Sequence, residues 1–79
     1  MKIKEASKYS IYNMAELANS IIAGCYYCKS IFKATEISET TDDGKTALCP
    51  KCDIDSVLPD SSPFQLNTET LSALNKYWF

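Results

Sequence analysis

The sequence predicts a small α+β domain that is held together by a bound metal ion. The chain has 79 residues, and a chain this short buries only about 60% of the surface that its unfolded form exposes, so its core alone leaves it marginally stable. Four cysteines stand in two Cys-x-x-Cys pairs, and small domains often gain the missing stability from a metal or from disulfides. We therefore expect one domain over residues 1–79.

The N-terminal part is expected to contain one helix. Residues 1–9 are polar and contain lysine, which predicts a frayed leader. From Ser10 onward the apolar residues recur mostly every three or four positions, a spacing that is typical of an amphipathic helix, here over residues 10–21 with Ser10 as its cap. No apolar run in this part has the length of a signal peptide or a membrane span, so we expect the protein in the cytoplasm.

The middle of the chain is expected to form a ribbon with two metal-binding turns over residues 22–55. The stretch SIIAG enters the first cysteine pair as an extended segment. The stretch ISETTDDGKTAL predicts a β-hairpin, because β-branched residues flank an Asp-Gly step, which is a strong signal for a tight turn.

The C-terminal part is expected to be a loop followed by a helix. Residues 56–67 contain Pro59 and Pro63 and only a brief apolar run, which predicts a loop. Asn67 or Thr68 can cap a last helix over residues 68–78. The glutamate in its first turn, Glu69, interacts favourably with the helix dipole.

The two cysteine pairs predict a zinc site. Cys25 and Cys28 form the first pair, twenty residues intervene, and Cys49 and Cys52 form the second. Two such pairs at this separation match the pattern of zinc-binding ribbons. Each Cys-x-x-Cys turn, called a knuckle below, directs two thiolates at one point, and a hairpin brings the two knuckles together in tetrahedral all-sulfur coordination. We expect one structural zinc ion per chain, in a zinc ribbon or a treble-clef-like hairpin.

Other uses of the cysteines fit the pattern less well. Disulfides are rare in the reducing cytoplasm, and a thioredoxin-like site needs a single Cys-x-x-Cys motif in a βαβ setting. A rubredoxin-like iron electron carrier also uses two knuckles, the second often followed by glycine. Asp53 stands at the position of that glycine, and we take this as an argument against iron.

Catalysis is not expected. Four thiolates would close the coordination shell, whereas a catalytic zinc ion usually keeps a position open for water. The chain has no histidine, which excludes histidine-dependent chemistry on a zinc scaffold. The function predicted is that of a non-catalytic adaptor or regulatory protein that binds another protein.

Nucleic-acid binding is the alternative function. Tyr26 and Tyr27 lie inside the first knuckle and could stack on single-stranded bases, with a basic face supplied by Lys29, Lys33, Lys45 and Lys51. However, the chain has no arginine, the usual residue for contacts to bases and phosphates, and its side chains carry a net charge of -2. We expect the two tyrosines to pack against the ribbon instead.

The stretches GCYYC and DDGKTALCPKCDIDSVL, followed by a capped helix that ends in YWF, resemble a family of small bacterial zinc-ribbon proteins described as cytoplasmic proteins. The resemblance covers roughly residues 11–79 and is most specific at DGKTALCPKCDIDSV. It implies a zinc-ribbon or treble-clef fold with the four cysteines as zinc ligands, and it implies no activity. Members tend to have glycine where Asp53 stands, so we expect Asp53 to adopt a left-handed backbone conformation. Similar short chains occur in phage genomes, which makes a phage or host factor a candidate partner.

Overall fold

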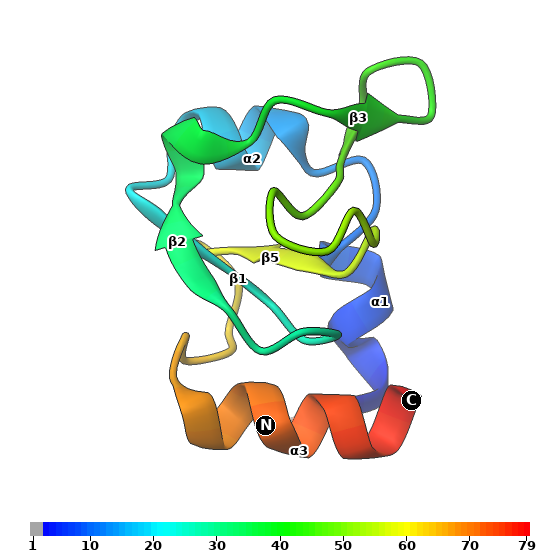
Figure 1. The fold of residues 1–79 in the computed structure, drawn as a ribbon, viewed down its shortest axis with the longest axis vertical. Helices are drawn as coiled ribbons and strands as arrows, with labels where there is room; N and C mark the ends of the chain where they lie inside the picture. Colours follow the sequence, from blue (N-terminus) through cyan, green and yellow to red (C-terminus); the bar gives the residue numbers. More distant parts are fainter. Residues whose placement is uncertain (1–2) are drawn as a thin grey trace.

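A three-stranded antiparallel sheet lies at the centre of the molecule, and helices pack on its two sides (Figure 1). The computed structural model describes residues 3–79. Its elements, in chain order, are η1 (Ile3–Glu5), α1 (Ala6–Tyr9), α2 (Met14–Ala18), β1 (Ile22–Cys25), β2 (Ile31–Lys33), η2 (Ala34–Glu36), β3 (Thr40–Thr41), β4 (Thr46–Ala47), β5 (Val57–Pro59) and α3 (Thr68–Trp78). The predicted α+β class is confirmed.

The sheet has the strand order β2-β1-β5, and both pairings are antiparallel. Cys25 lies opposite Val57, and Gly24 lies opposite Leu58. Because successive side chains of a strand point to opposite faces, this register divides the buried residues into two groups, one on each face of the sheet.

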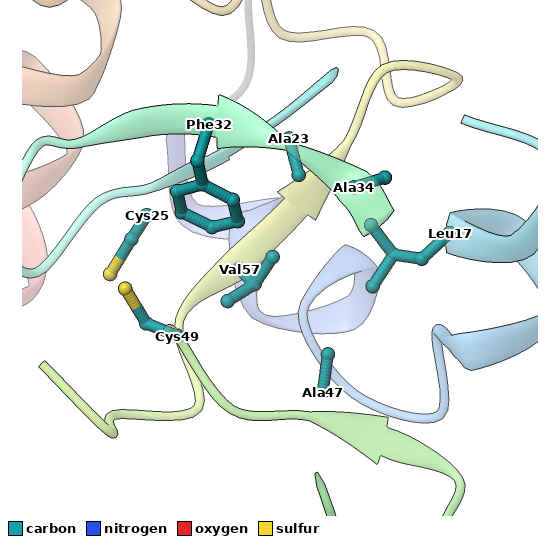
Figure 2. Packing of buried hydrophobic residues seen from close by; sticks show 8 residues of the cluster. All are labelled: Leu17, Ala23, Cys25, Phe32, Ala34, Ala47, Cys49 and Val57. Atoms are coloured by element: carbon teal, nitrogen blue, oxygen red, sulfur yellow. The ribbon is translucent and has the colours of Figure 1, made fainter. Parts of the chain in front are cut away.

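The first core lies on the face that carries the cysteines. Figure 2 shows Cys25 and Cys49 with their sulfur atoms directed toward each other, beside the ring of Phe32 and the side chain of Val57. The buried residues of this core are Leu17, Ala23, Cys25, Phe32, Ala34, Ala47, Cys49 and Val57. Apart from Leu17, Phe32 and Val57, its members are small. The sulfur atoms therefore stand among few large apolar groups.

The second core lies on the opposite face, under α3. Its buried residues are Ala6, Tyr26, Leu58, Phe64, Leu71 and Leu74. The helix comes very close to β1 at Gly24, where an added Cβ would lie 3.3 Å from the side chains of both Leu66 and Leu71. A glycine inside a strand often marks such a close approach of another element, and here it lets α3 cover the sheet.

Side chains occupy both outer edges of the sheet. On β5, the amide nitrogen Nδ2 of Asn13 donates a 2.8 Å hydrogen bond to the carbonyl oxygen of Val57. On β2, the backbone N–H of Lys33 donates to Oε2 of Glu36 at 3.0 Å. The other carboxylate oxygen of Glu36 lies 3.2 Å from Nζ of Lys51, in the second knuckle. Glu36 thus links the edge of the sheet to the cysteine turn.

The expected leader over residues 1–9 is wrong for the residues that the structure describes, since Ile3–Tyr9 is helical; residues 1 and 2 lie outside the description. Ile3, Ala6 and Tyr9 stand three positions apart and all contact the second core, and Ala6 is fully buried there. Packing against α3 and β5 stabilises this short helix, which polar composition alone does not predict.

The predicted helix over residues 10–21 is much shorter, since α2 spans only Met14–Ala18. Ser10 does not start it; its hydroxyl donates to the carbonyl oxygen of Ser7 at the end of α1. Tyr12 then adopts a left-handed conformation, with φ of 51°, which a continuous helix excludes. The apolar spacing belongs to two short helices joined by a tight turn.

The predicted loop over residues 56–67 contains a strand that pairs with β1, and the three residues of β5 are all buried. Pro59 has no N–H to donate, and it stands on a strand at the edge of the sheet, where proline is tolerated. The sheet therefore includes a strand, β5, that lies outside the ribbon predicted over residues 22–55. Within that range, the structure also contains β2 and η2, for which the sequence offered no clear signal.

Other expectations are confirmed. The last helix spans Thr68–Trp78 as predicted, and Oδ1 of Asn67 accepts a 2.8 Å hydrogen bond from the N–H of Thr70 as its cap. The predicted hairpin forms between β3 and β4, with Asp42, Asp43 and Gly44 at positive φ in its turn. Among residues 3–79, none of the helices has the length and apolar character needed to cross a membrane.

Candidate metal centre

The two knuckles have the same backbone structure, although they lie on different parts of the fold. In the first, the N–H of Lys29 donates to the carbonyl oxygen of Cys25, and the N–H of Cys25 donates to the carbonyl oxygen of Ser30. In the second, the same two bonds join Asp53 to Cys49 and Cys49 to Ile54, and all four bonds are 2.8–3.0 Å long. The repeated pattern gives both turns the same shape, so each presents its two sulfur atoms on one side.

One residue in each knuckle closes the turn with a left-handed backbone. Lys29 has φ of 67° and Asp53 has φ of 64°. Both directly follow the second cysteine of their pair, and both donate the N–H that bonds back to the first. The prediction for Asp53 is confirmed. Sequence reasoning missed Lys29, since lysine gives no signal for this conformation, and only the equivalent position in the other knuckle could have indicated it.

The four sulfur atoms form one tight cluster. All lie within 4.8 Å of one another, and the pairs Cys25–Cys52 and Cys28–Cys49 are separated by 3.7 and 3.6 Å. Zinc–sulfur bonds are about 2.3 Å long, and a tetrahedron built on them has sulfur–sulfur edges of about 3.8 Å. The cluster therefore has the dimensions of a tetrahedral site, and the structure brings together all four predicted ligands.

Burial acts to raise the pKa of the thiols of Cys25, Cys28 and Cys49. Burial raises the pKa of Cys25 far above its ordinary value and that of Cys49 to about 11. Burial also opposes ionisation of Cys28, but hydrogen bonds from the hydroxyl and the N–H of Ser30 outweigh it, and the pKa of Cys28 falls to about 7. Burial therefore disfavours the thiolate forms of Cys25 and Cys49, which a bound dication would stabilise.

The surroundings of the cluster contain hydrogen-bond donors and no competing ligand. The N–H of Lys51 donates to the sulfur of Cys49 at 3.3 Å, and a hydrogen bond of the same length joins the sulfur of Cys28 to the hydroxyl of Ser30. Among residues 3–79, these four cysteines are the one group of three or more side chains of metal-ligand type that could share an ion. The arrangement can hold a metal ion through four sulfur atoms.

Tyr26 and Tyr27, which are neighbours in the sequence, have different surroundings in the structure. Tyr26 is buried in the second core, and its hydroxyl is 3.0 Å from the hydroxyl of Ser10. Tyr27 is about half exposed, and its ring meets that of Phe79 edge-on, with centroids 4.7 Å apart. Tyr26 cannot offer a ring face to a base, so the stacking pair on which the nucleic-acid alternative depended is not present.

Two of the four lysines that could supply a basic face, Lys45 and Lys51, lie beside carboxylates. Lys51 pairs with Glu36, and Lys45 lies beside Asp42 and Asp43 around the same hollow. At these two places positive and negative side chains lie together, as the mixed composition of the segment predicts.

Comparisons of the chain with protein-family models, with curated proteins and with solved structures find no match. The resemblance to small bacterial zinc-ribbon proteins accordingly stays a prediction, and the function has to be argued from the residues of the site itself.

Proposed function

We propose that this protein is a non-catalytic adaptor of the reducing cytoplasm, folded around one structural zinc ion, which acts by binding another protein. The observation that carries the proposal is the closed set of four sulfur ligands, from Cys25, Cys28, Cys49 and Cys52, two of them fully buried. Four thiolates leave a zinc ion little room for substrate or water, which is the character of a structural site.

Zinc is proposed over iron on the spacing of the two pairs along a ribbon. Asp53 gives less reason to exclude iron than the sequence suggested. Asp53 adopts the left-handed conformation that glycine would adopt, so its side chain does not by itself exclude a rubredoxin-like knuckle. The choice of metal is therefore put to a direct measurement.

That measurement is the metal content and colour of the purified chain. We expect one zinc per chain by elemental analysis and no visible absorption. A red protein with iron bound in the same amount would overturn the proposal and indicate an electron carrier. The control is Cys49→Ser together with Cys52→Ser, which should bind less than a tenth of the metal.

Binding to another protein is proposed because the exposed surface carries several large apolar side chains. These side chains are Ile11, Tyr12, Ile21, Tyr27, Ile31, Tyr77 and Phe79, each at least two fifths exposed. Tyrosine and tryptophan are enriched in the contact residues of protein interfaces. The sequence has neither histidine nor arginine to support phosphate or base recognition.

The test of the adaptor role is capture of a protein on the immobilised, zinc-loaded chain, followed by calorimetry with the purified partner. Saturable one-to-one binding that survives nuclease treatment supports the proposal. The contrary result is tight binding of a single-stranded oligonucleotide that weakens steeply with salt, with no protein partner.

A further inference from the structure

The turn between α1 and α2 holds two large side chains out in the solvent. Ile11 is 45% exposed and Tyr12 is 63% exposed. Tyr12 also has positive φ, a conformation that costs free energy for a bulky residue and that persists only where the surroundings hold it in place. The question is what such an arrangement achieves on the surface.

Hydrogen bonds to the β3–β4 hairpin fix the turn. The N–H of Tyr12 donates to Oγ1 of Thr46 at 2.8 Å, and that hydroxyl donates to Oδ2 of Asp42, also at 2.8 Å. The N–H of Met14 donates to the carbonyl oxygen of Lys45. The ring of Tyr12 is therefore attached to a rigid backbone next to the β3–β4 turn. A tyrosine side chain has only two rotatable torsions, so it loses little conformational entropy when a partner covers it.

Tyr12 forms a wall shared by two hollows. The hollow on one side has a volume of about 330 Å³, and its lining includes Tyr9, Ile11, Glu16 and Pro59. The hollow on the other side has a volume of about 220 Å³ and is lined by Tyr12, Asp42, Asp43 and Lys45. The first hollow has apolar walls from Tyr9, Ile11 and Pro59 together with polar groups such as Lys8 and Glu16, and the second combines one aromatic ring with charged groups.

The charges around Tyr12 favour a cationic occupant. The second hollow has two carboxylates and one ammonium group, a net charge of -1. In the first hollow, Lys8 already pairs with Glu5 at 3.0 Å, which leaves the carboxylate of Glu16 as the uncompensated charge. A guanidinium or ammonium group next to a tyrosine ring and a carboxylate gains both a cation–π contact and a charged hydrogen bond.

We propose that this surface, Ile11 and Tyr12 with the two hollows beside them, binds a basic peptide segment of the partner protein. An arginine or lysine of that segment enters the hollow of Asp42 and Asp43 against the ring of Tyr12. A neighbouring aliphatic residue enters the hollow of Tyr9 and Pro59. The proposal rests on the adaptor function above and names the class of segment that the adaptor recognises.

The experiment selects binders from a library of random twelve-residue peptides on the zinc-loaded full chain. We expect enrichment of peptides with arginine or lysine next to an aliphatic residue. Fluorescence anisotropy with one enriched peptide should show affinity about tenfold lower for Tyr12→Ala and about three- to tenfold lower for Asp43→Asn. Replacing the peptide's basic residue by citrulline or acetyl-lysine should lower the affinity similarly.

Tyr77→Ala is the matched control, because Tyr77 is also an exposed tyrosine, 58% accessible, but lies on α3; it should leave the affinity unchanged. Zinc content and circular dichroism of each variant confirm that it is folded. Enriched peptides without a basic residue, or affinity that Tyr77→Ala lowers and Tyr12→Ala does not, would overturn this surface while leaving the adaptor function standing. An absence of any peptide binder overturns the inference as well, and capture of a folded partner then decides the adaptor function separately.

Discussion

Asn13 connects three segments of the chain through one buried amide. Its Nδ2 donates to the carbonyl oxygens of Tyr9 and Val57, at 3.1 and 2.8 Å, and its Oδ1 accepts from the N–H of Ala47 at 3.1 Å. Only 2% of the residue is exposed. The sequence suggested an ordinary helical position for Asn13, because the partners of a buried amide lie far away along the chain and leave no local signal.

Asn13→Ala should lower the free energy of unfolding by about 2–3 kcal/mol, because it leaves buried backbone groups of β4 and β5 without partners. Urea denaturation of the zinc-loaded protein measures the change. Asn19→Ala is the control, since Asn19 is exposed and its side-chain amide donates to the carbonyl oxygen of Ala15 in the adjoining helix α2. Equal losses for the two variants would show that Asn13 does not join the segments.

Lys29, in contrast to Asn13, is a residue whose backbone conformation matters more than its side chain. Lys29→Val should destabilise the protein by about 1–2 kcal/mol and weaken zinc binding, because a β-branched residue strongly disfavours left-handed φ. Lys33→Val makes the same chemical change on the extended strand β2 and should have little effect. Competition with a zinc chelator gives the affinities, and no difference between the two variants would contradict the role assigned to Lys29.

At the scale of the elements, the sequence predicted well those that depend on local signals. The capped helix α3 and the Asp-Gly hairpin are of this kind, because capping residues and turn residues act within a few positions. β2 and β5 have three residues each, too few for a periodic pattern, and they are strands because β1 lies between them. The N-terminal helix likewise depends on contacts with α3.

Ala6→Glu tests whether the N-terminal segment is a packed helix instead of a frayed leader. Ala6 is fully buried in the second core, so a glutamate there would place a carboxylate without a partner among apolar side chains and should cost at least about 2 kcal/mol. Ala15→Glu, on the exposed side of α2, should change the stability by less than about 0.5 kcal/mol. A frayed leader would make both variants equally stable, which thermal denaturation would reveal.

At the scale of the whole molecule, the two cores share the sheet. Cys25 and Val57 belong to the first core, while Gly24 and Leu58, next to them in β1 and β5, face the second. A change at the cysteines therefore reaches α3 through strands that both cores need. The metal centre and the distant helix are expected to unfold as one unit.

Removal of the metal tests whether the metal centre and α3 unfold together. A strong chelator should lower the stability by an amount on the order of 10 kcal/mol and unfold the protein. The single tryptophan, Trp78, lies on α3 and donates its indole N–H to the carbonyl oxygen of Ile3 at 3.0 Å. Its fluorescence should shift to longer wavelength together with the loss of helical circular dichroism. A native helix signal after chelation would show that the second core is stable alone.

The sequence predicted the candidate site more completely than it predicted the fold. The four ligands follow from spacing, because each knuckle is a local turn and its two thiols need no distant information. The position of Glu36 beside the second knuckle could not be predicted, since its carboxylate reaches Lys51, fifteen residues away along the chain, only after the sheet has formed. Burial of Tyr26 depends in the same way on α3 and on α1.

The carboxylate of Glu36, which bonds to the N–H of Lys33, has a consequence for solubility. An edge strand with free backbone groups can pair with the edge of another molecule and start aggregation. Glu36→Ala should raise light scattering at high protein concentration, whereas Glu39→Ala should not, and Glu36→Gln should be intermediate because its amide oxygen can still accept the bond. Equal scattering by all three would contradict this role. The same side chain pairs with Lys51 beside the metal centre, so a well-formed knuckle also helps to keep the protein dispersed.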